Sequence, residues 1–183
     1  MSTLYVDNLA PKTSGNKIIM PPGGIIQVQY TQFTGTSTPS IAANTSTALT
    51  DLTVNITPAS ASSVIHLQAH IFLEFGVDAS NPFNHTFFFY RDTTKLSHAA
   101  AGSRRVGISA ATRTYEQVDD NSTPLIARYD YFDTPDTTST ITYKCGVSVQ
   151  VADTIAINRT IGDIDNAAYE RGISFISATE IAG

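Results

Sequence analysis

The chain has 183 residues, the size of a single all-β domain, and its hydrophobic content of 42% is enough for a packed core, which excludes wholesale disorder. Only 15% of the residues are charged, well below the usual quarter, and the net charge is −5. An acidic chain has the wrong sign for non-specific binding to nucleic acid and for adhesion to anionic lipid. A single cysteine excludes an internal disulfide, and no apolar stretch reaches membrane-spanning length, so we expect no nucleic-acid partner and no membrane insertion.

The N-terminal segment contains two short strand-like runs, residues 4–6 and 17–20, joined by turn formers. A break with the sequence PPGG, residues 21–24, follows before any sizeable hydrophobic pattern begins. Because so little apolar surface cannot form a core, we expect residues 1–23 to be an arm and residues 24–183 to be the head domain. The segment also lacks the basic and apolar regions of a secretory signal, which indicates synthesis in a cytoplasm.

The head domain alternates apolar and polar residues with a period of two, which is typical of strands with one buried face. In residues 141–151 the predicted buried face carries Ile141, Tyr143, Cys145, Val147, Val149 and Val151. In residues 64–75 it carries Ile65, Leu67, Ala69, Ile71, Leu73 and Phe75. Shorter runs of the same kind are IIQVQYTQ, DLTVNIT, LIARYDYF, TIAINRT and ISFISATEI. About eight such strands, separated by turn clusters and without a helical pattern, predict an all-β antiparallel sandwich, most simply a jelly roll.

Two segments depart from this simple alternation. The sequence HTFFFYR, residues 85–91, is apolar on both faces, so we expect both faces to be covered, within the domain or by a neighbouring subunit. If copies of the chain assemble around an axis, this strand is expected to face it. The sequence AAAGSRRVGISAA, residues 99–111, is rich in small residues and predicts a long loop or an edge.

Polar residues at 66, 70 and 74 have the spacing H-x-x-x-H-x-x-x-E, which on a helix would align three metal ligands. The alternation predicts a strand, on which residues four apart are separated by about 13 Å, so one chain cannot bring His66 and His70 to one ion. The first interpretation is that His66, His70 and Glu74 are polar residues on the less buried face. The second is a symmetric assembly in which copies of His66 or His70 meet around an axis, with an ion or a pH-sensitive contact there.

Asp163, Asp165 and Asn166 supply closely spaced oxygen atoms of the kind that bind calcium. The central glycine and terminal glutamate of a calcium loop are missing, so turn formation is the favoured interpretation. Nucleophilic catalysis also lacks support, because no G-x-S-x-G motif is present and Cys145 falls in a predicted buried row. We therefore expect a protein that is not an enzyme and has no cofactor or metal.

Sugar binding is the remaining small-ligand function to consider. Phe83 and Tyr115 are predicted loop aromatics that can stack on a pyranose, although tryptophan, the best platform, is absent. Arg104, Arg105 and Arg113 lie in a loop-like region and can contact acidic glycans. We favour a solvated or inter-subunit role for these residues over a receptor contact.

Several segments of the chain resemble bacteriophage tail-fibre and minor virion proteins. The opening STLYVDNLAPKTSGNKIIMPPGGIIQVQY is similar to the start of many such proteins, in which two short strands flank a Ser/Gly turn. The matching segments of the body are DLTVNITPASASSVIHLQAHI, FFYRDTTKL, YFDTPDTTSTITYKCGVSV, IAINRT and ISFISATEIAG. The resemblance covers nearly the whole chain, and the terminal E-I-A-G is its most specific part.

This resemblance implies a virion structural protein with a trimeric jelly-roll head similar to complement and tumour-necrosis-factor heads. It is expected to be made in a bacterial cytoplasm and to act as a short tail fibre, spike or capsid-surface decoration, because the sequence has no long stalk. The arm is expected to dock on another virion protein by strand pairing, through Leu4, Tyr5, Val6, Ile18 and Ile19. The alternatives are an arm folded back on its own head, a head that binds a host-surface glycan, a tail-associated polysaccharide depolymerase and a secreted lectin-like module.

Overall fold

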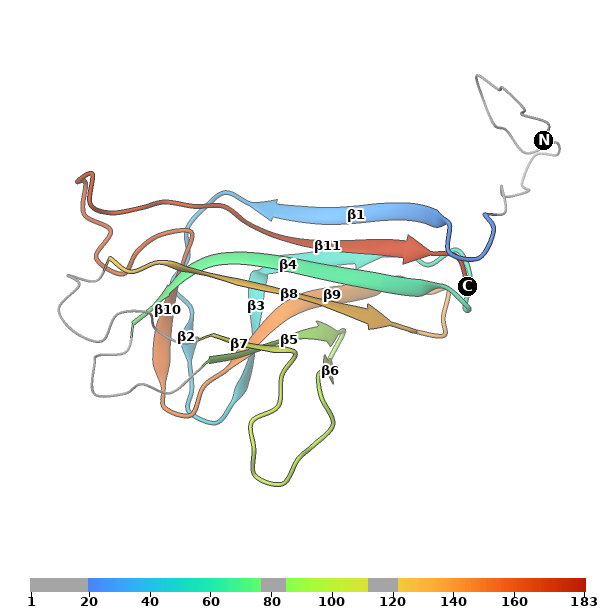
Figure 1. Ribbon diagram of the computed structural model, residues 1–183, viewed down its shortest axis with the longest axis horizontal. Coiled ribbons are helices and arrows are strands. Elements are labelled where there is room, and N and C mark those ends of the chain that lie inside the picture. The colour runs from blue at the N-terminus through green and yellow to red at the C-terminus, as the bar shows by residue number, and fades with distance from the viewer. Residues whose placement is uncertain (1–19, 77–84, 112–121) are drawn as a thin grey trace, which may run out of the picture.

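The computed structural model describes residues 20–76, 85–111 and 122–183, and these residues contain eleven strands and no helix (Figure 1). The strands are β1 Ile25–Phe33, β2 Ser40–Ile41, β3 Ser46–Ile56, β4 Val64–Phe75, β5 His85–Arg91, β6 Thr94–Leu96, β7 Ser109–Ala111, β8 Leu125–Asp133, β9 Ile141–Ser148, β10 Asp153–Ile157 and β11 Ser174–Ile181. The predicted all-β class is therefore confirmed. No helix able to span a membrane is present in the described ranges.

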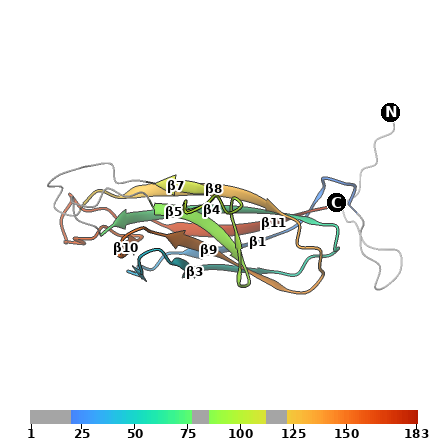
Figure 2. The same ribbon diagram turned by 90° about the horizontal axis from the view of Figure 1, so that it is seen from below.

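Two antiparallel sheets form a sandwich, which Figure 2 shows nearly edge-on. In the first sheet β1 pairs with β11 and β11 with β4, while β8 and β10 both pair with β4 and β2 pairs with β10. In the second sheet the order is β3, β9 and β5, and both β6 and β7 pair with β5. The long strands β1, β3, β4, β5, β8 and β9 alternate between the two sheets along the chain, as in a jelly roll.

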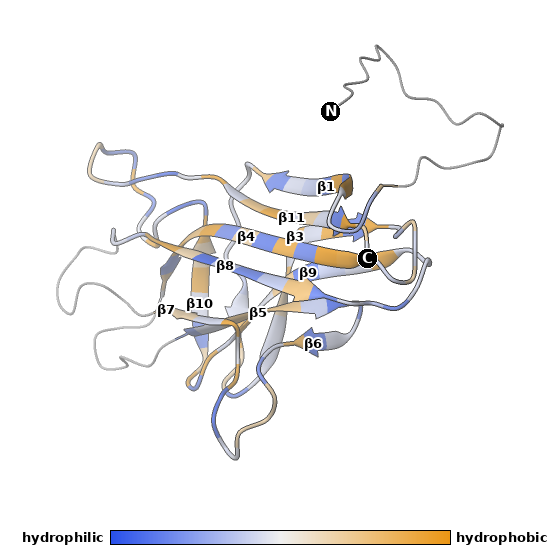
Figure 3. Cartoon of the chain, turned by 45° about the vertical axis from the view of Figure 1, so that its right-hand side comes forward, coloured by the Kyte–Doolittle hydropathy of each residue, from blue (hydrophilic) through white to orange (hydrophobic). Residues whose placement is uncertain are grey.

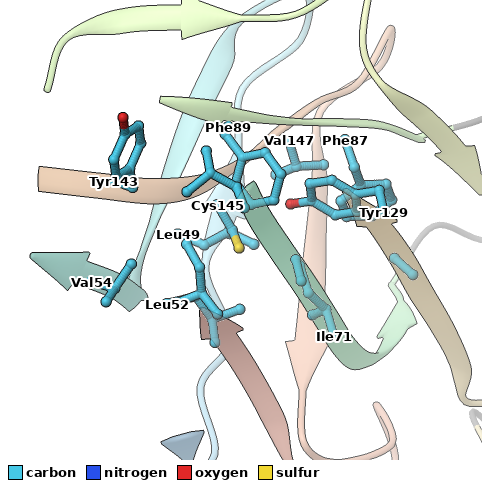
Figure 4. Close-up of a cluster of buried hydrophobic side chains, with 14 of the residues drawn as sticks. Leu49, Leu52, Val54, Ile71, Phe87, Phe89, Tyr129, Tyr143, Cys145 and Val147 are labelled. Atoms are coloured by element: carbon cyan, nitrogen blue, oxygen red, sulfur yellow. The ribbon is translucent and has the colours of Figure 1, made fainter. Parts of the chain in front are cut away.

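The core lies between the sheets and is built from the alternating rows. All six predicted inward residues of β4, from Ile65 to Phe75, are at most 2% exposed. Four residues of the predicted buried row lie on β9 and face the row of β4 across the core. Figure 4 shows three of them, Tyr143, Cys145 and Val147, in one cluster with Phe87, Phe89 and Tyr129. Burying an apolar side chain of this size contributes about 1.5–3 kcal/mol. Val151 departs from the prediction and is 38% exposed, because it lies beyond both the end of β9 at Ser148 and the bridge of Val149 with Ala43.

Strand β5 is covered on both faces by its own chain. Phe87 and Phe89 point into the core, while Phe88 points outward and is nevertheless fully buried. A Cβ atom at position 146 would overlap the Phe88 ring, so Gly146 leaves the room that the ring needs on β9, and Lys95 Nζ lies 3.9 Å above the ring centroid. Cover of Phe87, Phe88 and Phe89 within the domain is confirmed.

The turn between β5 and β6 and the loop from β6 to β7 form where the local sequence favours them. Asp92 begins the tight turn between β5 and β6 with a φ of 53°, a region that aspartate tolerates better than most residues. The small-residue segment that follows combines both expected structures. It forms a loop after β6 and then the edge strand β7, which pairs with β5.

Candidate functional site

The outer face of the first sheet is the surface that the structure singles out. We use "outer face" for the side chains of β1, β11, β4 and β8 that point away from the core. The strand register places them in cross-strand rows. These rows are Val28–Thr179–His66–Phe132, Tyr30–Ser177–Gln68–Asp130, Gln32–Phe175–His70–Arg128 and Phe72–Ile126.

Large apolar side chains gather on the outer face and remain in contact with solvent. Tyr30 is 70% exposed, Phe132 58%, Ile126 54% and Val28 51%. The other side of the sandwich is different, because its strands present polar residues such as Asn55, Thr142 and Lys144 to solvent. Figure 3 shows hydrophilic and hydrophobic bands along β4 and β8, whose successive residues point to opposite faces of the sheet.

His66 forms one of two stacked pairs on the outer face. Its ring lies parallel to that of Phe132 on β8, with the centroids 4.2 Å apart and an interplanar angle of 8°. Its Nε2 atom lies 3.5 Å from Oδ2 of Asp130 on β8. The neighbour of this histidine is therefore an acidic side chain.

His70 forms the second stacked pair, with Phe175 on β11, at a centroid distance of 5.5 Å. Its Nδ1 atom lies 3.0 Å from Nη2 of Arg128. Because a guanidinium group can only donate hydrogen bonds, Nδ1 is the acceptor and the ring proton is on Nε2. Burial and the neighbouring Arg128 charge both lower the pKa of His70 below its ordinary value, so the ring is uncharged at neutral pH.

A shallow hollow of about 300 Å³ lies in the middle of the outer face. Its lining combines the Phe175 ring with the polar side chains of Gln68, Arg128 and Asp130. These groups can make hydrogen bonds and apolar contacts. Among the described residues no group of three or more His, Cys, Asp or Glu side chains is placed to hold a metal ion.

The three polar residues of the H-x-x-x-H-x-x-x-E pattern lie in different environments. His66 and His70 lie on the less buried face, as the first interpretation predicted. The prediction was wrong for Glu74, which is fully buried and accepts hydrogen bonds from the backbone N–H groups of Thr123, at 2.8 Å, and Ile161, at 2.6 Å. Loops distant in sequence cover the end of β4 and convert an outward position into a buried one.

The acidic cluster around residue 163 is part of a turn with its own ion pairs. Asp163 has a φ of 46° and accepts hydrogen bonds from Nε and Nη2 of Arg171, at 2.6 and 2.7 Å. Arg159 Nε lies 3.4 Å from the same carboxylate. Both carboxylate oxygens therefore have cationic partners from the protein, in agreement with the favoured turn interpretation.

The predicted contact residues are only partly described, and those that are described lie away from the outer face. Arg104 is exposed in the loop between β6 and β7, and the side chain of Arg105 donates to the carbonyl of Ser148 at 3.4 Å, beside the second sheet. The other predicted contact and docking residues lie outside the described residues. They are Leu4, Tyr5, Val6, Ile18, Ile19, Phe83, Arg113 and Tyr115.

Sequence reasoning missed the exposed aromatic residues of the outer face, although one signal was present. In LIARYDYF the alternation places Ala127, Tyr129 and Tyr131 on the inner side, yet Ile126 and Phe132 fall on the other side. A strand with large apolar residues on both sides has a second surface to cover. Only the strand register reveals that three other strands add to the same surface.

Comparisons with known proteins give limited similarity. No protein-family model matches the chain, and no curated protein matches it in sequence. Among solved structures it is similar to a mutant VP2 protein of infectious bursal disease virus in derived T=1 particles, with 11% identity and a TM-score of 0.39 over 98% of this chain and 45% of that one. The Gt strain of the same virus gives 12% identity and a TM-score of 0.39 over 98% of this chain and 47% of that one. The chain spans less than half of the length of each of these proteins.

Proposed function

We propose that the chain is a non-enzymatic structural protein of a bacteriophage virion, made in the host cytoplasm. It acts as a short tail fibre, a spike or a capsid-surface decoration, its head forms a homo-oligomer, as the trimeric heads that it resembles do, and residues 1–23 attach it to another virion protein. The observation that carries this proposal is the outer face, where Tyr30, Ile126, Phe132 and Val28 are each more than half exposed. These four large apolar side chains are exposed on one side of one sheet, with polar residues between them, and this unpartnered face supports a protein that works in an assembly. The resemblance of the opening and terminal segments to phage virion proteins supports the choice of assembly.

Incorporation into virions tests the proposal. A tagged full-length chain and a tagged chain lacking residues 1–19 are supplied during infection, and purified virions are probed for the tag. The shorter chain retains the backbone hydrogen bonds of Gly23 and Gly24 to Ala182, which close the start of the head. We expect the full-length chain in virions and the shorter chain only in the soluble fraction. Absence of the full-length chain from virions would remove the proposal.

A second candidate function, binding of a host-surface glycan, is favoured by the hollow on the outer face. Phe175 supplies an apolar ring there, and Gln68, Arg128 and Asp130 supply the hydrogen-bonding groups that a sugar requires. A glycan array probed with the intact protein tests this candidate, with Asp130→Ala as the variant expected to lose binding. Retained binding by that variant would place the sugar elsewhere.

A further inference from the structure

We propose that copies of this chain contact one another through the outer face of β1, β11, β4 and β8, and that the contact requires an uncharged His70. The inference rests on the proposed function, because that function requires a head that forms homo-oligomers. It specifies the surface that the copies use, names a second copy of the chain as the partner, and states that protonation of His70 separates the copies.

The outer face has the size of a protein interface. Strands lie about 4.8 Å apart and rise about 3.3 Å per residue, and neighbouring strands of this face share between seven and nine paired residues, so the face covers roughly 440–570 Å². Two such faces together give roughly 900–1,100 Å², close to the roughly 1,000 Å² expected of a specific interface. A small ligand in the hollow would leave most of this face uncovered.

The charges on the outer face fit a second copy of the chain. Apart from the covered Glu74, the described residues of this face include two side chains that are charged at neutral pH, Arg128 and Asp130, which are two residues apart on β8. A second copy presents the same cation and anion at the same spacing, so each charge can meet its opposite in the partner. A strongly charged partner such as nucleic acid or anionic lipid would find no matching patch.

The stacked rings also favour packing against protein. Because the ring of Phe132 lies parallel to that of His66 at 4.2 Å, one of its faces is covered by its own chain. The remaining ring face and the ring edges are open to the side chains of a second sheet.

His70 is the group that makes the contact sensitive to acid. It faces Arg128 on β8 and Phe175 on β11, while His66 on its own strand and Asp130 on β8 are the other titratable groups exposed on this face. Protonation turns Nδ1 into a donor, so the hydrogen bond from Arg128 is lost and two cations lie side by side. A second copy that excludes water strengthens this repulsion, so acid favours separate copies.

The test is the solution mass of the intact chain, by light scattering after gel filtration, at about pH 7.5 and at about pH 5, a lower value chosen well below an ordinary histidine pKa because burial and Arg128 lower the pKa of His70. We expect an oligomer at the higher pH and a monomer at the lower. His70→Gln keeps an acceptor for Arg128 but cannot become charged, so it should remain assembled at both. His66→Gln is the matched control and should separate in acid like the wild type, because Asp130 rather than Arg128 lies beside His66.

A second pair of variants tests the surface itself. Phe132→Lys combined with Phe175→Lys should be monomeric at both pH values, while Asn55→Lys adds the same charge on the opposite side of the sandwich and should stay assembled. Circular dichroism establishes that each variant is folded. If the double variant does not fold, Tyr30→Lys tests the same face at a residue that is 70% exposed.

The outcomes separate this inference from the proposed function. A wild-type mass that does not change with pH, an assembled folded Phe132→Lys, Phe175→Lys variant, or acid separation of His70→Gln would overturn the inference. Virion incorporation together with any of these results would leave the virion role standing. Absence from virions, with a mass that depends on the outer face and on His70 as expected, would remove the virion role alone.

Discussion

Two buried glutamates fasten loops to the ends of the first sheet. Glu74, at the end of β4, accepts backbone hydrogen bonds from Thr123 and Ile161. Glu180, near the end of β11, accepts hydrogen bonds at 2.6 Å from the backbone of Ala59 and from the side chains of Ser63 and Gln27. A charged acceptor makes stronger hydrogen bonds than a neutral one, so these residues hold the loops more firmly than an amide would.

We predict that Glu180→Gln lowers the free energy of unfolding at neutral pH by roughly 1–3 kcal/mol, since a buried network loses its charged acceptor. Burial alone would raise the pKa of Glu180, but the hydrogen bonds from Ser63, Gln27 and Ala59 outweigh it and lower the pKa below its ordinary value. A carboxyl group with a lowered folded pKa stabilises the protein above its ordinary pKa, and this stabilisation is lost as the pH falls through the folded pKa.

Urea unfolding measures the difference between wild type and variant at about pH 7 and again below about pH 4, where the ordinary glutamate pKa lies. The difference in free energy of unfolding between the wild type and Glu180→Gln should be large at pH 7 and should become smaller in acid. Glu170→Gln is the control, because the same substitution at this exposed position should cost little at either pH. A difference for Glu180→Gln that stays constant with pH would contradict the charged-acceptor role.

At the scale of elements, β5 is fixed to the opposite sheet at both of its ends. His85, its first residue, pairs with Asp153 on β10, with Nε2 and Oδ2 2.6 Å apart and both side chains buried. Arg91, its last residue, pairs with Asp133 on β8 at 3.0 Å. The hydroxyl of Tyr143 on β9 donates to the same aspartate at 2.6 Å. These contacts connect the two sheets and therefore set the position of β5 across the core.

We predict that Tyr143→Phe lowers the free energy of unfolding by about 1–2 kcal/mol, because buried Asp133 then loses one of its two side-chain donors and no water replaces it easily. Tyr90→Phe is the matched control. Its hydroxyl donates to the carbonyl of Ser46 at 3.0 Å in a half-exposed position, where water can take its place. Urea unfolding, with an unchanged m-value, measures the change in free energy of unfolding for each variant. Equal changes for Tyr143→Phe and Tyr90→Phe would show that the Tyr143 hydroxyl has no special role.

The strands were predictable from the sequence because alternation is a local property. The row from Ile65 to Phe75 lies in the core as its period predicts. The burial of Glu74 and of Phe88 was not predictable, because each is covered by segments distant in sequence, the loops at residues 123 and 161 in one case and Gly146 with Lys95 in the other. The outer face depends in the same way on the register of four strands.

At the scale of the whole molecule, the head closes on itself without the first nineteen residues. Gly23 N donates to the carbonyl of Ala182 at 2.8 Å, and Ala182 N donates to that of Gly24 at 2.8 Å, so the ends of the described chain are joined beside β1 and β11. The residues of the outer face all lie between Gly24 and Ala182 in the sequence. We therefore expect assembly through that face to occur without the arm.

We predict that a chain lacking residues 1–19 has a free energy of unfolding within about 0.5 kcal/mol of that of the full-length chain, because all eleven described strands and the junction of Gly23 and Gly24 with Ala182 lie within residues 20–183. Its solution mass at neutral pH, measured by light scattering after gel filtration, should correspond to the same number of copies as the full-length chain. The Phe132→Lys, Phe175→Lys variant serves as the monomeric standard. An oligomer that forms only when residues 1–19 are present would mean that the arm holds the copies together, and both the docking role of the arm and the contact through the outer face would then be wrong.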